Sequence, residues 1–257
     1  MPEGDSVLQA AIRLREALAG KPLDRCDIRV PQHATVNLSG EVVEAVTSRG
    51  KHLFIEAGQI AIHSHLGMDG AWHVYEAEQR WRRPGHTARI VLEAGGRQAV
   101  GFSLKQLDVV PAATAGSLID HLGPDLLGPD WDAAEAVRRI AADPDRSISV
   151  ALLDQRVMAG IGNVYRNELC FLRGLHPETP VGEVGDLDAI VRLAYRLLTF
   201  NATRTVRVTT GETRPGRELW VYGRGRKPCR RCQTLIARDG EADRVTYWCP
   251  SCRPAVG

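Results

Sequence analysis

The sequence lacks any apolar run long enough to cross a bilayer, and it contains neither an internal repeat nor a low-complexity tract. Its first residues are acidic and polar, without the apolar stretch of a secretory signal. We therefore expect neither a membrane protein nor a secreted one, but a cytoplasmic protein whose thiols stay reduced. The chain also has little excess of either charge, because the formal net charge is only +2.

The excess of positive charge is concentrated in one segment. Residues 204–232 contain nine Arg or Lys and two Glu. Such a stripe suits a surface that faces phosphate groups, although a solvated basic face would have the same composition. The whole chain is 44% hydrophobic and 25% charged, as in ordinary globular proteins, and its 257 residues suffice for two medium-sized domains and a small module.

Hydrophobic periodicity divides the chain into regions. Residues 7–18 repeat apolar side chains at helical spacing, and Gly20 and Pro22 end that helix. Short alternating or β-branched runs then predict an antiparallel β-sandwich, with strands at 26–30, 42–46, 52–56, 60–65, 88–92 and 107–110. Helices are predicted at 133–140, 150–158, 164–172 and 187–198. The fold class is therefore α+β and multidomain.

Two Cys-x-x-Cys pairs lie sixteen residues apart near the end of the sequence; they are Cys229 with Cys232 and Cys249 with Cys252. This spacing is typical of one structural zinc ion held by four thiolates. Two disulfides are the alternative, but they do not persist where thiols stay reduced. Short β-type runs at 234–237 and 245–248 flank an Asp-Gly turn, so we predict a zinc-held β-hairpin.

The residues after Met1 suggest nucleophilic catalysis. If Met1 is removed, Pro2 carries a free secondary amine, and Glu3 places a carboxylate beside it. A secondary amine that attacks an aldehyde-level carbon forms an iminium ion, which has no N–H to lose and acts as an electron sink. An α-amino group has a pKa of roughly 7.7–8.0, so a useful fraction is deprotonated at neutral pH. An ordinary exposed terminus is the alternative.

A glycine turn joins two of the predicted helices. Leu152-Leu-Asp-Gln155 leads to Ala159-Gly-Ile-Gly-Asn163, and Asn163 lies at or just before the start of the second helix. Exposed backbone N–H groups there, together with the helix dipole, would form a phosphate cradle. A plain helix–helix turn, with Gly ending one helix and Asn capping the next, is the alternative.

Six motifs follow one another along nearly the whole chain. They are Pro2-Glu3-Gly4-Asp5, Arg49-Gly-Lys-His52, Leu152-Leu-Asp-Gln155, Ala159-Gly-Ile-Gly-Asn163, Val221-Tyr-Gly-Arg224 and the paired Cys-x-x-Cys. In this order they closely resemble the formamidopyrimidine-DNA glycosylase/endonuclease VIII family. The resemblance implies an N-terminal helix with an antiparallel β-sandwich (1–116), a helix-two-turn-helix domain (117–222) and a zinc β-hairpin (223–257), with DNA held in the cleft between.

The resemblance also implies a bifunctional DNA glycosylase and AP lyase of base excision repair, which flips the damaged nucleotide out of the duplex. Pro2 would attack C1′ of the sugar and Glu3 would protonate the ring oxygen as general acid. The iminium ion then drives β-elimination and δ-elimination. Lys51 is implied as the lysine that contacts phosphate and assists β-elimination, Asn163 as a phosphate ligand, and Arg244 as the hairpin arginine associated with δ-elimination.

Several departures favour the endonuclease VIII branch and hence oxidised pyrimidines. The oxidised-purine branch usually carries Asp-Pro-Arg-Arg-Phe-Gly where this chain has Gly101-Phe-Ser-Leu-Lys-Gln106. Met68 resembles the methionine that fills the gap left by the flipped base, and a core methionine is the alternative. His121 falls where that branch has a DNA-contacting arginine, and a surface or helix-capping histidine is the alternative.

The expected partners are one structural Zn²⁺ and single- or double-stranded DNA with oxidised bases or abasic sites, bound by a monomer that associates with the nucleoid. A silent damaged-DNA-binding protein and an enzyme that prefers oxidised purines are alternatives on the same scaffold. A zinc-ribbon protein of RNA or transcription complexes would explain only the hairpin. Without the resemblance, Lys51 is an ordinary strand-end lysine and Arg244 a solvated charge. Pro2, Glu3 and Lys51 favour the enzyme, because binding alone requires none of them.

Overall fold

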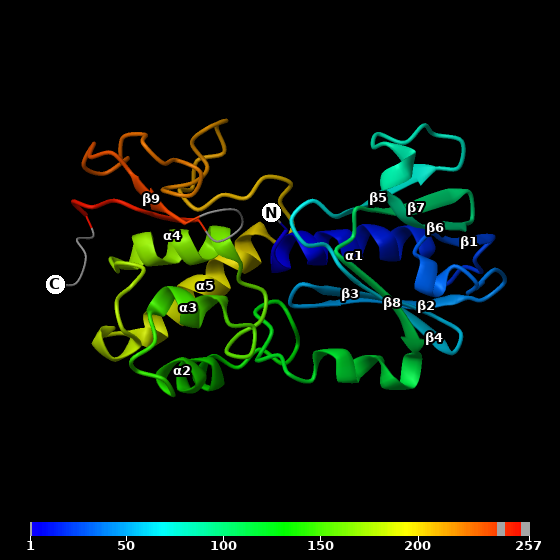
Figure 1. Ribbon diagram of the computed structural model, residues 1–257, viewed down its shortest axis with the longest axis horizontal. Helices are drawn as coiled ribbons and strands as arrows, with labels where there is room; N and C mark the ends of the chain where they lie inside the picture. The colour runs from blue at the N-terminus through cyan, green and yellow to red at the C-terminus, as the bar shows by residue number, and fades with distance from the viewer. Residues whose placement is uncertain (1, 241–244, 253–257) are drawn as a thin grey trace. The chain divides into compact units, whose positions relative to one another are not determined.

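The computed structural model describes residues 2–240 and 245–252 (Figure 1). The chain divides into two compact units, Met1–His121 and Leu122–Gly257, and each has its own hydrophobic core. Among the described residues, no helix combines the length and the hydrophobicity needed to cross a membrane.

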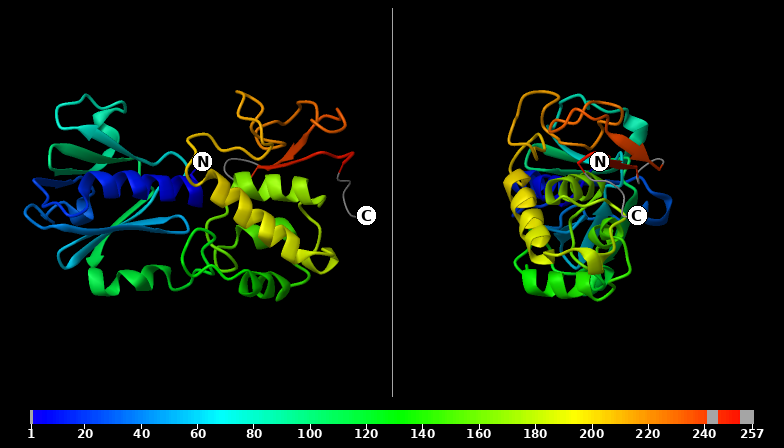
Figure 2. Two further views of the ribbon diagram at one scale, coloured as in Figure 1. Left: turned by 180° about the vertical axis from the view of Figure 1, so that it is seen from behind. Right: turned by 90° about the vertical axis from the view of Figure 1, so that its left-hand side faces the viewer.

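The first unit is a helix packed between two antiparallel sheets. Helix α1 (Gly4–Leu18) contacts strands of both sheets, and Figure 2 shows it between them. The sheets have the strand orders β1-β6-β7-β5 and β2-β3-β4-β8. The strands are β1 (Arg25–Ile28), β2 (Val43–Arg49), β3 (His52–Ala57), β4 (Ile60–His65), β5 (Ala71–Glu76), β6 (Ala88–Ala94), β7 (Arg97–Phe102) and β8 (Gln106–Pro111). The predicted N-terminal helix and antiparallel sandwich are therefore confirmed.

The spacing of apolar residues along each helix and strand places their side chains in the core of this unit. Leu14 and Leu18 of α1 are fully buried against Leu53 of β3 and Leu92 of β6. Each buried aliphatic side chain of this kind contributes roughly 1.5–3 kcal/mol to folding. Strands β5 and β7 were not among the predicted runs. In β5 both faces carry apolar or aromatic side chains, so the polar–apolar alternation that reveals a half-buried strand is weak.

A 3₁₀ helix covers part of the outer face of the β2-β3-β4-β8 sheet. This helix, η3 (Ala112–Ile119), contacts β4 and β8 (Figure 1). Its Ala115 packs with Phe54 and Ala61. The sheet is therefore buried on both faces along much of β3 and β4. Shorter 3₁₀ turns lie at Pro31–His33, Gly85–Thr87 and Val181–Glu183.

The second unit is a helical bundle with a two-stranded hairpin. Its elements are α2 (Ala133–Ala141), α3 (Ile148–Leu153), α4 (Asn163–Arg173), α5 (Leu187–Asn201), β9 (Ala237–Asp239) and β10 (Thr246–Trp248). The fully buried side chains of Tyr165, Leu169 and Ile190 lie in its core. Strands β9 and β10 pair antiparallel, and β10 contacts α4. The predicted helices and hairpin are present here, but the first hairpin strand, predicted at 234–237, is β9 at Ala237–Asp239 and includes Asp239 of the predicted turn.

One predicted helix is shorter than expected. The prediction ran over residues 150–158, but α3 ends at Leu153 because Asp154 has an extended conformation (φ −72°, ψ 107°). The Asp154 carboxylate accepts a hydrogen bond from the backbone N–H of Arg156 at 3.0 Å and forms ion pairs with Arg146 and Arg156. A short acidic side chain that bonds to the nearby backbone competes with helix continuation.

Candidate functional site

Pro2 and Glu3 lie directly before α1. Glu3 is the N-cap residue of the helix, and its carbonyl accepts a hydrogen bond from Val7 N–H at 3.0 Å. Its side chain is fully buried, whereas Pro2 is half-buried. The positive end of the helix dipole favours a carboxylate at this position. A rigid helix thus fixes the position of both predicted catalytic residues.

Lys51 lies in the tight turn that joins β2 to β3. The strands pair up to Arg49 and His52, and Gly50 has φ +56°, a conformation that favours glycine. The turn places Lys51 at one end of the β2-β3-β4-β8 sheet. The neighbouring side chains at this end of the sheet are histidines.

Four of the eight histidines of the chain form a cluster next to Lys51; they are His52, His63, His65 and His121. The His52 and His63 rings stack with centroids 5.1 Å apart, and His65 meets His52 edge-on at 5.3 Å. The exposed His121 ring lies 6.3 Å from His52. The structure therefore brings Lys51 and His121, two predicted site residues, to the same cluster.

A hydrogen-bonded chain runs through this cluster. Asp108 Oδ2 lies 3.0 Å from His63 Nδ1, and His63 Nε2 lies 2.8 Å from His52 Nδ1. His63 is only 1% exposed. When His63 is neutral, its Nδ1–H donates to the carboxylate and its Nε2 accepts from His52 Nδ1–H. His52 then keeps its own Nε2 as a hydrogen-bond acceptor.

Two of these histidines are uncharged at neutral pH. Burial, and then the charges of neighbouring groups including His63 and Lys51, lower the pKa of His52 to about 3. Burial, and then Lys51 and Lys105, lower the pKa of His65 to about 4. Lys51 and Lys105, rather than these two histidines, thus supply positive charge here. The cluster was not predicted, although His52, His63 and His65 share one sheet face by strand period.

Met68 lies at the tip of the loop between β4 and β5 and is 48% exposed, which excludes the alternative that it fills the core. Gly67 has φ +69°, and Gly70 N–H closes the loop by donating to the Leu66 carbonyl at 3.0 Å. Arg83 Nη1 donates to the Asp69 carbonyl at 2.6 Å. The loop is therefore held from both sides while the methionine points away from the core.

In the second unit, Gln155 organises the glycine turn before α4. Its Oε1 accepts from Gly160 N–H at 3.0 Å, and its Nε2 donates to the carbonyls of Leu153 and Ile161, each at 2.9 Å. Helix α4 begins at Asn163, with Gly162 as its N-cap. The amide side chain of Gln155 thus fixes the backbone of both predicted motifs.

Asn163 connects this turn to the hairpin. Its side chain is 3% exposed, and its Nδ2 donates to the Val245 carbonyl at 3.0 Å. Asn167 Nδ2 donates to Asn163 Oδ1 at 3.0 Å, and Asn167 Oδ1 accepts from Tyr247 N–H at 2.6 Å. The predicted residue Arg244 lies outside the described residues. Its neighbour Val245 is, however, bonded directly to Asn163.

Glu168 is a buried carboxylate that was not predicted to have a role. It is fully buried on α4 and accepts from the backbone N–H groups of Trp220, Val221 and Tyr222 at 2.8–2.9 Å. Thr209 Oγ1 also donates to it. One carboxylate therefore fixes the Val221-Tyr-Gly-Arg224 motif to the helix.

Part of the basic segment 204–232 is used internally. Arg224 Nη1 donates to the Trp220 carbonyl at 2.5 Å, and Arg230 Nε donates to the Leu219 carbonyl at 3.0 Å. Arg231 lies over the Phe171 ring at 4.5 Å. These arginines stabilise the segment itself. The sequence had suggested either a phosphate-facing surface or a solvated basic face, and neither includes such internal contacts.

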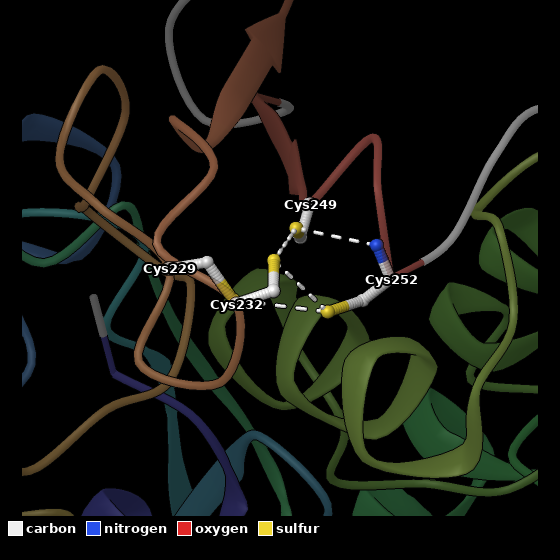
Figure 3. A group of neighbouring side chains, drawn as sticks. All are labelled: Cys229, Cys232, Cys249 and Cys252. Carbon is white, nitrogen blue, oxygen red and sulfur yellow. Dashed lines mark hydrogen bonds between the residues drawn. The ribbon is translucent and has the colours of Figure 1, made fainter.

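The four cysteines lie together at the end of the hairpin (Figure 3). Their sulphur atoms all lie within 4.8 Å of one another, and the Cys232–Cys249 and Cys232–Cys252 pairs are 3.4 Å apart. A disulfide requires about 2.05 Å. Four thiolates about 2.3 Å from one tetrahedral zinc ion lie about 3.8 Å from each other. The donor set therefore fits one structural zinc ion, as predicted.

Three family models match the chain. They are the formamidopyrimidine-DNA glycosylase N-terminal domain over residues 1–104, the formamidopyrimidine-DNA glycosylase H2TH domain over 122–201, and the zinc finger found in FPG and IleRS over 226–255. The matched segments follow one another in the order of the elements described above.

Curated relatives match over the full length. The chain is 54% identical to the DNA-(apurinic or apyrimidinic site) lyase Nei2 of Mycolicibacterium smegmatis, covering 99% of this chain and 100% of the relative. It is 53% identical to endonuclease 8 2 of Mycobacterium tuberculosis, covering 98% and 100%. Formamidopyrimidine-DNA glycosylase of Bacillus subtilis is 27% identical, covering 98% and 99%.

A solved structure confirms the fold. The Lactococcus lactis Fpg in complex with abasic-site DNA is similar with a TM-score of 0.81 and 21% identity, covering 98% of this chain and 100% of that one. The chain therefore belongs to the formamidopyrimidine-DNA glycosylase/endonuclease VIII family, and its sequence is most similar among these relatives to endonucleases VIII.

Proposed function

We propose that the protein is a bifunctional DNA glycosylase and AP lyase of base excision repair, which excises oxidised bases and then cleaves the strand. The observation that carries this proposal is the fixed position of Pro2 and the buried Glu3 at the start of α1, in a chain that matches AP lyases over its full length. Binding DNA requires neither residue, whereas amine catalysis requires both.

The proposed reaction begins when the Pro2 amine, freed by removal of Met1, attacks C1′ of a flipped nucleotide. Glu3 donates a proton to O4′ as the C1′–O4′ bond breaks and the sugar ring opens. The base then leaves with the C1′–N bond electrons and takes up the proton that the Pro2 nitrogen releases. The resulting iminium ion acidifies the C2′ protons. Loss of one of them expels the 3′ phosphate by β-elimination, and a second elimination expels the 5′ phosphate.

Residues of both units would hold the DNA backbone in this reaction. Lys51 would contact a phosphate and assist β-elimination, and His52 and His65 beside it carry no positive charge at neutral pH. Asn163 would bind phosphate at the start of α4, and Arg244 would bind the phosphate that leaves in δ-elimination. Phosphate contacts of this kind position DNA without reading its sequence.

Two further residues would act near the flipped nucleotide. Met68 would enter the gap in the base stack, which suits an apolar side chain exposed at a loop tip. His121 would contact a phosphate, which its exposure beside the histidine cluster supports.

We further propose that oxidised pyrimidines are preferred over oxidised purines. The relatives that share 51–54% identity are named Nei2 or endonuclease 8 2, whereas those named formamidopyrimidine-DNA glycosylase share 27–28% and one named endonuclease 8 shares 29%. The segment 101–106 also contains no arginine, and Lys105 stands where the purine branch has its phenylalanine.

The cellular setting is part of the proposal. We infer a monomer in the cytoplasm that binds the nucleoid through damaged DNA. We also infer that the chain works as three parts, a catalytic sandwich (1–116), a helix-two-turn-helix domain (117–222) and a zinc hairpin (223–257).

Borohydride trapping tests the function directly, because borohydride reduces an iminium ion to a stable cross-link. Protein lacking Met1 would be mixed with oligonucleotides that carry an abasic site, thymine glycol, dihydrouracil or an oxidised guanine. We expect cross-links with the abasic and pyrimidine-lesion DNA, and none with Pro2→Ala.

The variant also supplies the control for binding. Pro2→Ala should retain its affinity for abasic DNA, because the substitution leaves every phosphate contact in place. Trapping of Pro2→Ala at the wild-type level would refute Pro2 as the nucleophile. Tight binding without any cross-link by the processed wild-type protein would support the silent DNA-binding alternative.

A further inference from the structure

A cationic patch of the first unit is not used by the proposed reaction. It consists of Arg13 on α1 and Arg80, Arg82 and Arg83 in the loop 77–87 between β5 and β6. Within residues 2–240 and 245–252, Arg13, Arg80 and Arg82 form no ion pair, and the loop's acidic residue, Glu78, is not paired with them. Several guanidinium groups therefore lie close together without a counter-charge.

Three contacts hold the arginine-bearing loop against the sheet. The Trp81 indole N–H donates to Gln98 Oε1 of β7. The backbone N–H of Arg82 donates to the Tyr75 hydroxyl at 3.2 Å, and Arg83 Nη1 donates to the carbonyl of Asp69 at 2.6 Å. The cationic side chains are thus presented by an anchored backbone, which lowers the entropy lost when they bind a ligand.

The imidazole of His73 lies within the same patch. The hydroxyl of Tyr75, which is only 3% exposed, accepts from Arg82 N–H and lies 2.9 Å from His73 Nδ1. When the Tyr75 hydroxyl donates its proton to His73 Nδ1, the proton of neutral His73 resides on Nε2. The ring thus offers an N–H donor beside the arginines.

These groups surround a concave surface. A cavity of about 290 Å³ is lined by Arg13, Trp72, His73, Val74, Tyr75 and Arg82. A second cavity of about 500 Å³ is lined by residues 80–85, so Arg82 borders both. Burial, and then the charges of Arg83, Arg82 and Arg13, lower the pKa of His73. An anion in the smaller cavity would relieve the repulsion among these cations.

We infer that Arg13, His73 and Arg82 form a phosphate-binding site for a backbone phosphodiester of the DNA that flanks the lesion. This inference rests on the proposed function, since it assumes that damaged DNA is the ligand. Flanking DNA is favoured over an acidic protein because Arg83 connects the patch directly to the loop of Met68, the residue proposed to enter the base stack.

The length of α1 gives the distance between the Arg13 site and the start of the helix, where Pro2 and Glu3 lie. Arg13 follows Gly4 by nine residues of α1, which corresponds to roughly 14 Å at 1.5 Å per residue. Since each strand rises about 3.4 Å per base pair, a separation of this length spans at most about four base pairs along the duplex.

The test is the salt dependence of binding to a duplex with a central tetrahydrofuran abasic-site analogue. Each lost phosphate contact reduces the steepness of log K against log salt by about 0.9, so Arg13→Gln/Arg82→Gln, which removes one such contact, should reduce it by about 0.9. Affinity for the long duplex should fall several-fold, and the difference from wild type should vanish once the flanks are too short to reach the patch. Arg25→Gln is the control, because Arg25 is 51% exposed but paired with Asp27 and Glu93.

NMR of His73 in the unaltered protein gives a second measurement that no folding defect can confound. Addition of the long duplex should raise the pKa of this imidazole, because a phosphate stabilises its charged form. An unchanged salt slope in the double variant, or an unchanged His73 titration, would overturn the site. Borohydride trapping by the wild-type protein tests the proposed function and does not depend on this patch. A negative result for the patch can therefore be told apart from a negative result for the proposed function.

Discussion

Glu3, His63 and Glu168 are ionisable side chains that are at most 1% exposed. Burying such groups is costly unless they are hydrogen-bonded or neutral. His63 is bonded to Asp108 and His52, and Glu168 to three backbone N–H groups. At the scale of single residues, these bonds fix the surroundings of Lys51 in one unit and of the basic segment in the other.

Buried histidines make stability depend on pH. The pKa values of His52 and His65 are about 3 and about 4 in the folded protein, against about 6.5 in an unfolded chain. Below pH 6.5 the unfolded chain therefore binds protons that the folded protein does not. The stabilisation present above pH 6.5 is lost as the pH falls towards 4. Melting temperatures measured from pH 7 to pH 5 should decrease.

One substitution isolates this effect. His52→Phe removes one of the two histidines of the cluster whose pKa is lowered. The melting temperature of this variant should therefore depend less on pH than that of the wild type. His86→Gln, at an exposed histidine outside the cluster, should follow the wild-type curve. Parallel curves for His52→Phe and wild type would contradict the role of this cluster in acid sensitivity.

At the scale of elements, loops are placed by bonds to helices and strands. Helix α4 bonds the 220–222 backbone through Glu168 and the hairpin through Asn163 and Asn167. The Met68 loop is fixed through Arg83 and through the bond from Gly70 N–H to the Leu66 carbonyl. Residues proposed to touch DNA are thus carried by loops that regular elements hold in place.

Glu168→Gln should destabilise the second unit. The substitution removes the charge from an acceptor of several backbone N–H groups and places an amide N–H₂ against donors. A hydrogen bond to a charged group contributes about 1.5–3 kcal/mol, so we expect a loss of about 3 kcal/mol in the free energy of unfolding. Denaturant titration measures this, with Glu183→Gln at an exposed position as the control. If Glu168→Gln lowers the free energy of unfolding by no more than Glu183→Gln does, Glu168 does not stabilise the second unit in this way.

Gly67→Ala should displace the Met68 loop. A left-handed conformation costs a non-glycine residue about 1–2 kcal/mol. An added Cβ would also lie 2.7 Å from Lys105 Cβ. Gly96→Ala is a matched control, because Gly96 has φ +77° but no atom within 4 Å of an added Cβ. Affinity for abasic DNA should fall for Gly67→Ala only, and equal affinities would argue against a DNA-facing loop.

At the scale of the whole molecule, the two units have separate cores. The hairpin has a small cluster of its own, in which Cys229, Cys249 and Ile236 pack with Val221 and with Phe171 of α4. A cluster of this size cannot hold a fold without additional cross-links, so the zinc ion supplies much of the stability of the hairpin.

Zinc removal should therefore act locally. Cys249→Ser, or a chelator, should make residues 223–257 susceptible to proteolysis and weaken DNA binding, whereas the first unit stays folded because its core contains no hairpin residue. Limited proteolysis with mass spectrometry and zinc stoichiometry would measure this. A protease-resistant hairpin without zinc, or unfolding of the first unit together with the hairpin, would refute the claim that zinc stabilises the hairpin alone.

The sequence by itself determined the order of elements, the zinc site and the family, because these depend on local periodicity, cysteine spacing and contiguous motifs. It also located Pro2 and Glu3 before a helix, where spacing along the chain is sufficient. Its errors were local: the helix predicted at 150–158 ends early because the Asp154 side chain bonds to the following backbone N–H, and β5 was missed because both its faces are apolar.

Only the tertiary structure decided which distant residues meet. The chain from Asp108 through His63 to His52 depends on the register of three strands, and the bond from Asn163 to Val245 joins residues 82 positions apart. The same holds for Arg13 and Arg82, which border one cavity from a helix and a loop. Such contacts depend on packing between elements, and no pattern within a single element encodes them.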